Sequence, residues 1–329
     1  MAIAGTALLI APGIAHAAGP GGGSVGSPKA SGEKKGNTIA SKIRFDVSKN
    51  SSKPSSGPLT VNSSNWTPPP CWYEPKYTPD QLKKEHGKTE RLPHTSGLGQ
   101  AIERFEDRYV EGHPYKNFNL AKKGKGMWWD RAALPYEEGG DIFACTKSAF
   151  WVDNGRPPQV EDAVTPEVLA ELAYAKIRVP DTEVELSPKT EQTVNLPTWT
   201  WLDKANFKPV SVTASLPELD ISATTTATPV SLKIDPGTQD ADLHPSSGSC
   251  EIGKNGSIGA PYTKGSGDKT PPCGLTYLRA SHGEPYEFRA TVTWKIAWTE
   301  TDGAGGDLPD GTFGTTQNVV VQEVQAINR

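Results

Sequence analysis

The stretch TVTWKIAWTE, residues 291–300, gives the first indication of the fold class. Apolar side chains occur there at every second position: Val292, Trp294, Ile296 and Trp298. Successive side chains of a β-strand point to opposite faces, so a period of two predicts a strand with one buried face. Residues 230–235 show the same alternation at Val230, Leu232 and Ile234, which predicts a second strand of this kind.

Six further stretches rich in Thr and Val lie between Pro and Gly turns, at residues 184–188, 193–202, 207–216, 275–281, 285–292 and 317–327. Several short strands at such spacing are typical of an antiparallel sandwich. We therefore expect an antiparallel β-sandwich of immunoglobulin-like architecture over residues 183–329. The likeness is architectural only, because Trp294 follows both nearby cysteines and the Cys-Trp-Cys order of antibody domains is absent.

The preceding region, residues 65–182, has helical rather than strand-like patterns. Thr165 followed by Pro166 predicts the start of a helix with an apolar stripe, and Ser96 is positioned to cap another. A short polar helix is expected after Thr78. We predict a small α+β module whose core contains large aromatic residues: Trp128, Trp129, Phe143, Phe150 and Trp151. The whole chain is thus expected to be α+β and mostly β.

The chain has four cysteines, an even number that favours two disulfides. Four cysteines allow three pairings, and spacing favours Cys71 with Cys145 and Cys250 with Cys273. A zinc site is the alternative for such residues, but no Cys-x-x-Cys motif occurs, so we expect no metal ligands among them.

The N-terminal region has the features of an export signal and a linker. Residues 2–15 form an apolar stretch, and Ala15-His16-Ala17 supplies the small residues of a signal-peptidase cleavage site. Residues 1–17 are therefore predicted to be a signal peptide, although no basic residue precedes the apolar stretch. Residues 18–64 are rich in Gly, Ser, Lys and Pro and are predicted to be a disordered basic linker. No apolar run reaches the roughly 18–20 residues of a bilayer span, so no transmembrane segment is expected in the mature chain.

The segments NLPTWTWLD and TVTWKIAWTETDGAGGDLP resemble stretches in uncharacterised secreted proteins of actinobacteria. The similarity covers roughly Cys71 to the C-terminus. It implies export and a β-rich C-terminal domain. It implies no catalytic residues, because those proteins have no assigned activity.

Four tryptophans are candidate binding residues: Trp199, Trp201, Trp128 and Trp129. Trp199 and Trp201 are two positions apart, so on a strand both rings point to one face, as in platforms that stack on sugars. The same geometry also fills a sandwich core, so both interpretations stay open.

Two acidic groups are candidates for other chemistry. The hairpin with Glu300, Asp302, Asp307 and Asp310 supplies oxygen atoms that suit calcium, but it lacks the register of an EF-hand loop. The second group is a set of middle-region carboxylates suited to glycoside hydrolysis: Glu103, Glu106, Asp130, Glu137, Glu138 and Asp141. We expect no histidine to have a second potential metal ligand at helical spacing. No cofactor is predicted.

The absence of nucleophile motifs favours binding over catalysis. Nucleic acid is not expected as a partner, because the body of the chain is acidic. We predict a secreted, extracellular or cell-wall-associated protein that acts by surface binding or scaffolding, with a cell-wall polymer or another envelope protein as partner. The alternatives are a secreted glycan-active hydrolase using the middle carboxylates, and an accessory component of an envelope or secretion assembly that docks through Pro68–Pro70.

Overall fold

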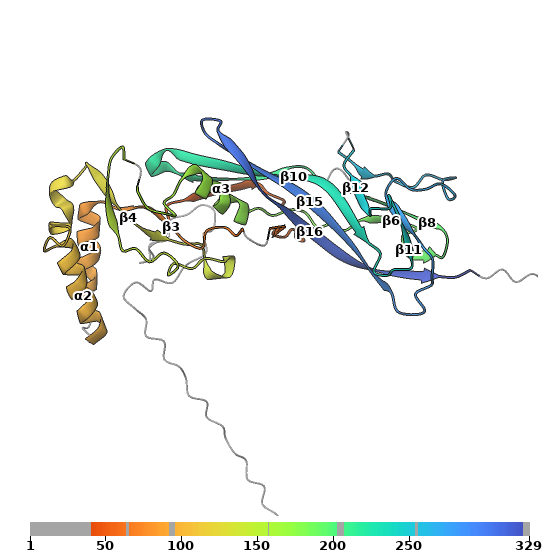
Figure 1. The fold of residues 1–329 in the computed structure, drawn as a ribbon, viewed down its shortest axis with the longest axis horizontal. Helices are drawn as coiled ribbons and strands as arrows, with labels where there is room; N and C mark the ends of the chain where they lie inside the picture. The colour runs from red at the N-terminus through yellow and green to blue at the C-terminus, as the bar shows by residue number, and fades with distance from the viewer. Residues whose placement is uncertain are drawn as a thin grey trace, which may run out of the picture.

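The computed structural model describes residues 41–63, 66–91, 96–156, 158–202, 207–253 and 256–324. The predicted signal peptide and residues 18–40 of the predicted linker lie outside the described residues. The described part is elongated, with two helices at one end and a small sheet at the other, joined by long strands (Figure 1). It is mostly β, as the sequence predicts, and contains two disulfides.

The long strands belong to a large, almost entirely antiparallel sheet. Its main path runs β1 (Arg44–Lys49), β9 (Val210–Leu216), β10 (Ile221–Asp235), β15 (Tyr286–Glu300), β16 (Gly305–Gln322) and β2 (Thr60–Val61). Two short strands extend it: β12 (Ser249–Glu251) pairs with β10, and β7 (Glu191–Thr193) runs parallel to β16.

One face of β15 is buried along most of the strand. Val292, Trp294 and Ile296 are fully buried and Trp298 is half-buried, which confirms the predicted alternation. Helix α3 (Pro166–Ala175) packs on one end of this face, next to β9 and β10. Thr225 of β10, which is fully buried, donates a hydrogen bond to the carbonyl of Ala170 in α3 (2.7 Å).

A five-stranded sheet covers the other end of the same face (Figure 1). Its strands are β11 (Ala241–His244), β14 (Gly274–Tyr277), β8 (Pro197–Leu202) and β13 (Ile258–Gly259), with β6 (Glu185–Ser187) also paired to β8. The disulfide between Cys250 and Cys273 joins β12 of the large sheet to the residue before β14. This end of the molecule is the predicted sandwich.

The two prolines inside the long strands lie at irregularities of the pairing. The register of β10 against β15 shifts between Pro229 and Ser231, which leaves Val230 as the extra residue of a bulge. The register of β15 against β16 shifts beside Pro309. Proline lacks the N–H that a regular ladder requires, so bulges are where a long strand tolerates it.

The predicted α+β module is built on a three-stranded sheet of β3 (Trp72–Tyr77), β4 (Gly126–Ala132) and β5 (Phe150–Asp153). The disulfide between Cys71 and Cys145 ties the start of β3 to the loop before β5. Helices α1 (Pro79–Thr89) and α2 (Ser96–Tyr109) follow β3, and short 3-10 helices lie at η1 (Asn117–Lys122) and η2 (Tyr136–Glu138). A third 3-10 helix, η3 (Pro217–Leu219), lies outside this module, between β9 and β10. Phe143, predicted to be in the core, is instead 72% exposed in a surface loop under Arg131.

The predicted starts of α1 and α3 agree with the structure. Thr165 caps α3 by accepting a hydrogen bond from the backbone N–H of Val168 (3.2 Å), and Pro166 occupies its first turn. Thr78 caps α1 in a reciprocal capping box with Gln81. Local capping chemistry was therefore sufficient to place both helix starts.

The predicted disordered linker is wrong for residues 41–63. In this region β1 pairs with β9 at the edge of the large sheet, and β2 pairs with β16. Ile43 is buried, and Asn50 exchanges hydrogen bonds with the backbone of Lys176 and Arg178. The segment is ordered because distant parts of the chain supply the apolar and polar partners that its own composition lacks.

The larger of two apolar cores runs from the three-stranded sheet through α3 into the large sheet. It therefore crosses the predicted boundary at residue 182, because α3 precedes that boundary in sequence but packs on β9 and β10. A second, smaller core lies under α1 and α2 and includes Leu82, Tyr109, Phe118 and Trp128.

Candidate functional site

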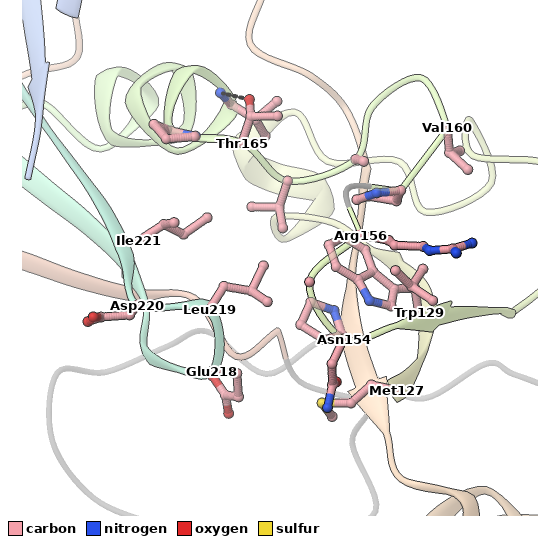
Figure 2. A pocket seen from close by; sticks show the side chains of 18 of the residues that line it. Met127, Trp129, Asn154, Arg156, Val160, Thr165, Glu218, Leu219, Asp220 and Ile221 are labelled. Atoms are coloured by element: carbon pink, nitrogen blue, oxygen red, sulfur yellow. Dashed lines mark hydrogen bonds between the residues drawn. The ribbon is translucent and has the colours of Figure 1, made fainter. Parts of the chain in front are cut away.

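A cavity of about 890 Å³ lies where the three-stranded sheet meets the end of the large sheet. Figure 2 shows side chains from both sheets facing it, with Met127 and Trp129 on one side and Leu219 and Ile221 on the other. Ligand sites are commonly concave and mainly apolar, with a few polar groups, so this cavity is the main candidate site.

The floor of the cavity is one face of the three-stranded sheet. Met127 and Trp129 are two positions apart on β4, so both project to the same face. Val152 of β5 is the register partner of Met127, and Pro75 of β3 is the register partner of Trp129. All four line the cavity and form an apolar surface at its base.

The loop between β5 and α3 forms a second side. It is held against β3 by two backbone hydrogen bonds of 2.9 Å, from Tyr73 to the carbonyl of Asp162 and from Val164 to the carbonyl of Tyr73. The loop contributes Val160, Val164 and several neighbours to the lining. Thr165, which caps α3, ends this side.

The opposite wall is the turn that joins β9 to β10. It consists of η3 and Asp220, whose φ of 55° lies in the left-handed region. This backbone turn presents Leu219 to the cavity with 38% of its surface exposed. Glu218 in the same turn pairs with Lys42, at 3.7 Å between Nζ and Oε1, so the segment before β1 reaches the rim.

The charged residues that line the cavity are mainly acidic: Asp153, Asp162, Glu218 and Asp220, against one lining cation, Arg156. Two nearby cations, Lys42 beside Glu218 and Lys122 beside Asp153, offset part of this charge and leave a small acidic excess. The indole N–H of Trp151 donates to Asp153 (2.7 Å) and lowers the pKa of that carboxyl, and Lys122 lowers it further. Asp153 is therefore ionised at neutral pH. An apolar floor with this rim suits a ligand that is apolar at its centre and carries positive charge.

The four candidate tryptophans have different environments. Trp129 lines the cavity. Trp128 is fully buried and donates to the carbonyl of Phe118 (3.1 Å), so it is a core residue and does not contact the surface. Trp199 is only 8% exposed and packs edge-on against Tyr262, while Trp201 is half-buried. The strand β8 does not display an open pair of rings.

Four of the six candidate carboxylates engage different partners. Burial raises the pKa of Asp130, and the nearby ammonium of Lys76 lowers it in part. Glu138 pairs with Lys176, and Asp141 accepts a hydrogen bond from the backbone of Phe143. Glu106 lies beside His86. Among the residues placed by the structure, these acids are therefore not gathered around one cavity.

The acidic hairpin forms the connection between β15 and β16. The turn itself spans residues 301–304, and Asp307 and Asp310 already belong to β16. Asp307 lies 3.5 Å from the ammonium of Lys295. Within the described ranges, neither group of possible metal ligands includes these acids.

The proline-rich segment proposed as a docking element is held by the protein itself on both sides. Trp66 stacks on Tyr174 of α3 with ring centroids 5.1 Å apart, and its indole N–H donates to Glu171. The carbonyl of Pro70 accepts a hydrogen bond from Asp141 (2.9 Å). Docking of a partner at Pro68–Pro70 stays a prediction.

Sequence reasoning missed two features. Leu219 and Arg156 reach the cavity from a turn and a loop, and no periodicity indicates such positions. His86 of α1 and Glu90, the C-cap residue of the same helix, are four residues apart, a helical ligand spacing, so the prediction that no histidine has such a partner is wrong. This spacing was the signal that could have identified them.

Comparison of the chain with protein-family models, curated proteins and solved structures finds no match. In the part of the chain that the structure describes, no helix is long and apolar enough to cross a membrane.

Proposed function

We propose that this protein is an exported, non-catalytic binding protein of the cell envelope or extracellular space, and that its cavity binds an apolar, positively charged segment of another envelope protein. The observation that carries the proposal is the cavity, with Trp129 and Met127 at its base and Leu219 exposed on its wall. Export is supported by the two disulfides, which persist in oxidising compartments.

A protein segment fits this site better than a polysaccharide. Sugar platforms need an accessible aromatic face, whereas Trp128 and Trp199 are buried and Trp201 is half-buried. The cavity instead offers several aliphatic contacts, from Val152, Val160 and Leu219, which suit apolar side chains. The acidic rim selects basic flanking residues and speeds their approach, mainly at low salt.

The test is selection from a random peptide library on the immobilised full chain. We expect enrichment of peptides that combine apolar and basic residues. The variant Leu219→Asp puts a charge on the apolar wall and should weaken binding of the selected peptides by about tenfold or more, because the charge must be desolvated. Leu219 is already partly exposed, so this substitution leaves the core unchanged.

Leu278→Asp is the matched control, because Leu278 is 46% exposed and does not line the cavity. It should leave peptide affinity unchanged. Equal loss in both variants, or selection of acidic peptides, would refute the proposed site. Export is tested separately by cell fractionation of the full chain: recovery in the cytosol with reduced thiols would contradict the location.

A further inference from the structure

A histidine and two glutamates converge near the C-terminal ends of α1 and α2. The Nε2 atom of His86 lies 3.3 Å from Oε1 of Glu90 and 3.3 Å from Oε1 of Glu106. One ligand atom from each of the three side chains lies within 4.8 Å of the others. The cluster is separate from the cavity, whose lining includes none of these residues.

The two helices bring these groups together for simple geometric reasons. Glu90 is the C-cap residue of α1 and lies four residues after His86, so both side chains lie on one face of the helix end. Glu106 comes from the last turn of α2. The cluster therefore spans two helices.

The imidazole of His86 is held in place. Its ring stacks on Phe105 with centroids 4.8 Å apart and planes 11° apart, and it packs on Phe118 at 5.6 Å. The His86 side chain is only 8% exposed, whereas those of Glu90 and Glu106 are 48% and 39% exposed. A fixed nitrogen thus faces two carboxylates that remain accessible from solvent.

We propose that His86, Glu90 and Glu106 bind one divalent metal ion of the zinc class. In a tetrahedral zinc site, bonds of about 2.0–2.2 Å place neighbouring ligand atoms roughly 3.3–3.6 Å apart. Both nitrogen–oxygen distances in the cluster are 3.3 Å and fall in this range. They are longer than the 2.9 Å contact between His113 and Asp107, which is a hydrogen bond.

The ligand set favours zinc or a similar transition metal over calcium and magnesium, because an imidazole nitrogen is a poor ligand for those harder ions. Two carboxylates and a neutral imidazole balance the charge of a divalent ion. Three protein ligands leave one tetrahedral position for water on the exposed side. The bound ion links α1 to α2 and stabilises the small core beneath them.

The second cluster of possible ligands, Asp107, Glu111 and His113, provides a useful contrast. All three residues are exposed, and no ring of the described residues stacks on His113. Its His113–Asp107 contact is an ordinary surface ion pair. We assign the metal to the His86 cluster alone.

The test is zinc titration of the full chain by calorimetry, with cobalt(II) absorption as a second readout of nitrogen and oxygen coordination. We expect one equivalent of zinc to bind the wild-type chain and raise its melting temperature. Glu106→Gln should weaken the binding by about tenfold or more, because it removes an anionic ligand. Glu90→Gln should do the same.

Glu103→Gln is the matched control, since Glu103 is an exposed residue on α2 outside the cluster. It should leave zinc affinity unchanged, as should His113→Ala. His86→Phe keeps an aromatic ring on Phe105 and should abolish the cobalt spectrum. Absence of zinc binding, or equal affinity in wild type and Glu106→Gln, would overturn the proposal, and His86 would then only contact the two carboxylates.

Discussion

Glu74 is predicted to fasten the N-terminal strand to the body of the protein. Its carboxylate is fully buried and accepts three hydrogen bonds: from the backbone of Lys42 (2.8 Å), the hydroxyl of Ser41 (2.8 Å) and the indole of Trp72 (2.9 Å). Glu74→Gln keeps the shape but turns one acceptor oxygen into a donor. Whichever way the amide is oriented, an N–H of Lys42 or Trp72 then faces another donor.

The expected cost follows from these contacts. A hydrogen bond to a charged group contributes about 1.5–3 kcal/mol, and an unsatisfied buried donor costs about 1–3 kcal/mol. The lost hydrogen bond and the unsatisfied donor are partly the same effect, so their costs do not simply add. We therefore expect Glu74→Gln to lower the free energy of unfolding by about 2–4 kcal/mol. Because two of the three donors belong to residues 41–42, β1 should also detach from β9 more often than in the wild type.

Two measurements check this expectation. Urea denaturation gives the loss of stability, and limited trypsin digestion reports opening of β1 through cleavage after Arg44 and Lys49. Glu137→Gln, at an exposed position in η2, is the matched control and should change neither result. A loss below about 0.5 kcal/mol, the range of ordinary surface substitutions, with unchanged cleavage of β1 would refute the assigned role of Glu74.

Three further predictions follow from buried groups. Trp128 and Trp294 are both fully buried, but of the two only the Trp128 indole has a hydrogen-bond partner among the described residues. In urea denaturation, Trp128→Phe should therefore lower the free energy of unfolding by about 1–2 kcal/mol more than Trp294→Phe does. Replacing Cys250 and Cys273 by alanine removes a disulfide with a sequence separation of 23 and should lower the free energy of unfolding by about 3 kcal/mol in urea denaturation. An unchanged stability would show that this disulfide does not constrain the unfolded chain. Burial raises the pKa of Tyr109 to about 12. Between about pH 10 and that value the unfolded chain has lost a proton that the folded chain keeps, so stability should fall as pH rises, by up to about 1.4 kcal/mol per pH unit. The fall should be steeper than one group explains, because burial also raises the pKa of Tyr77, Tyr174 and Tyr277. A flat stability profile in this range would contradict the burial of these hydroxyls.

Patterns within a few residues were enough to predict many of the elements. The alternation in residues 291–300 gave the buried face of β15, because strand geometry places every second side chain on one side. Thr165 and Pro166 gave the start of α3 through capping chemistry. Spacing also favoured the two disulfides that form.

Composition failed where order depends on distant partners. The segment around Ile43 is too polar to order itself, and it is ordered by β9 and by Glu74, which is 31 residues further along than Ile43. The cavity was equally hidden, because Trp129 lies on β4 of the three-stranded sheet, whereas Leu219 lies in the turn between β9 and β10 of the large sheet. No sequence pattern within either segment indicates that the two segments pack against one cavity.

Backbone periodicity and helix capping act over short separations, so the order of residues alone sufficed for the strands and the helix starts. The even number of cysteines was enough to expect crosslinks. The cavity wall, the anchored first strand and the approach of Glu106 to His86 arose only when the chain packed. Each of them requires groups from separate elements to come within a few ångströms, and that proximity is set by how the sheets and helices share their apolar faces.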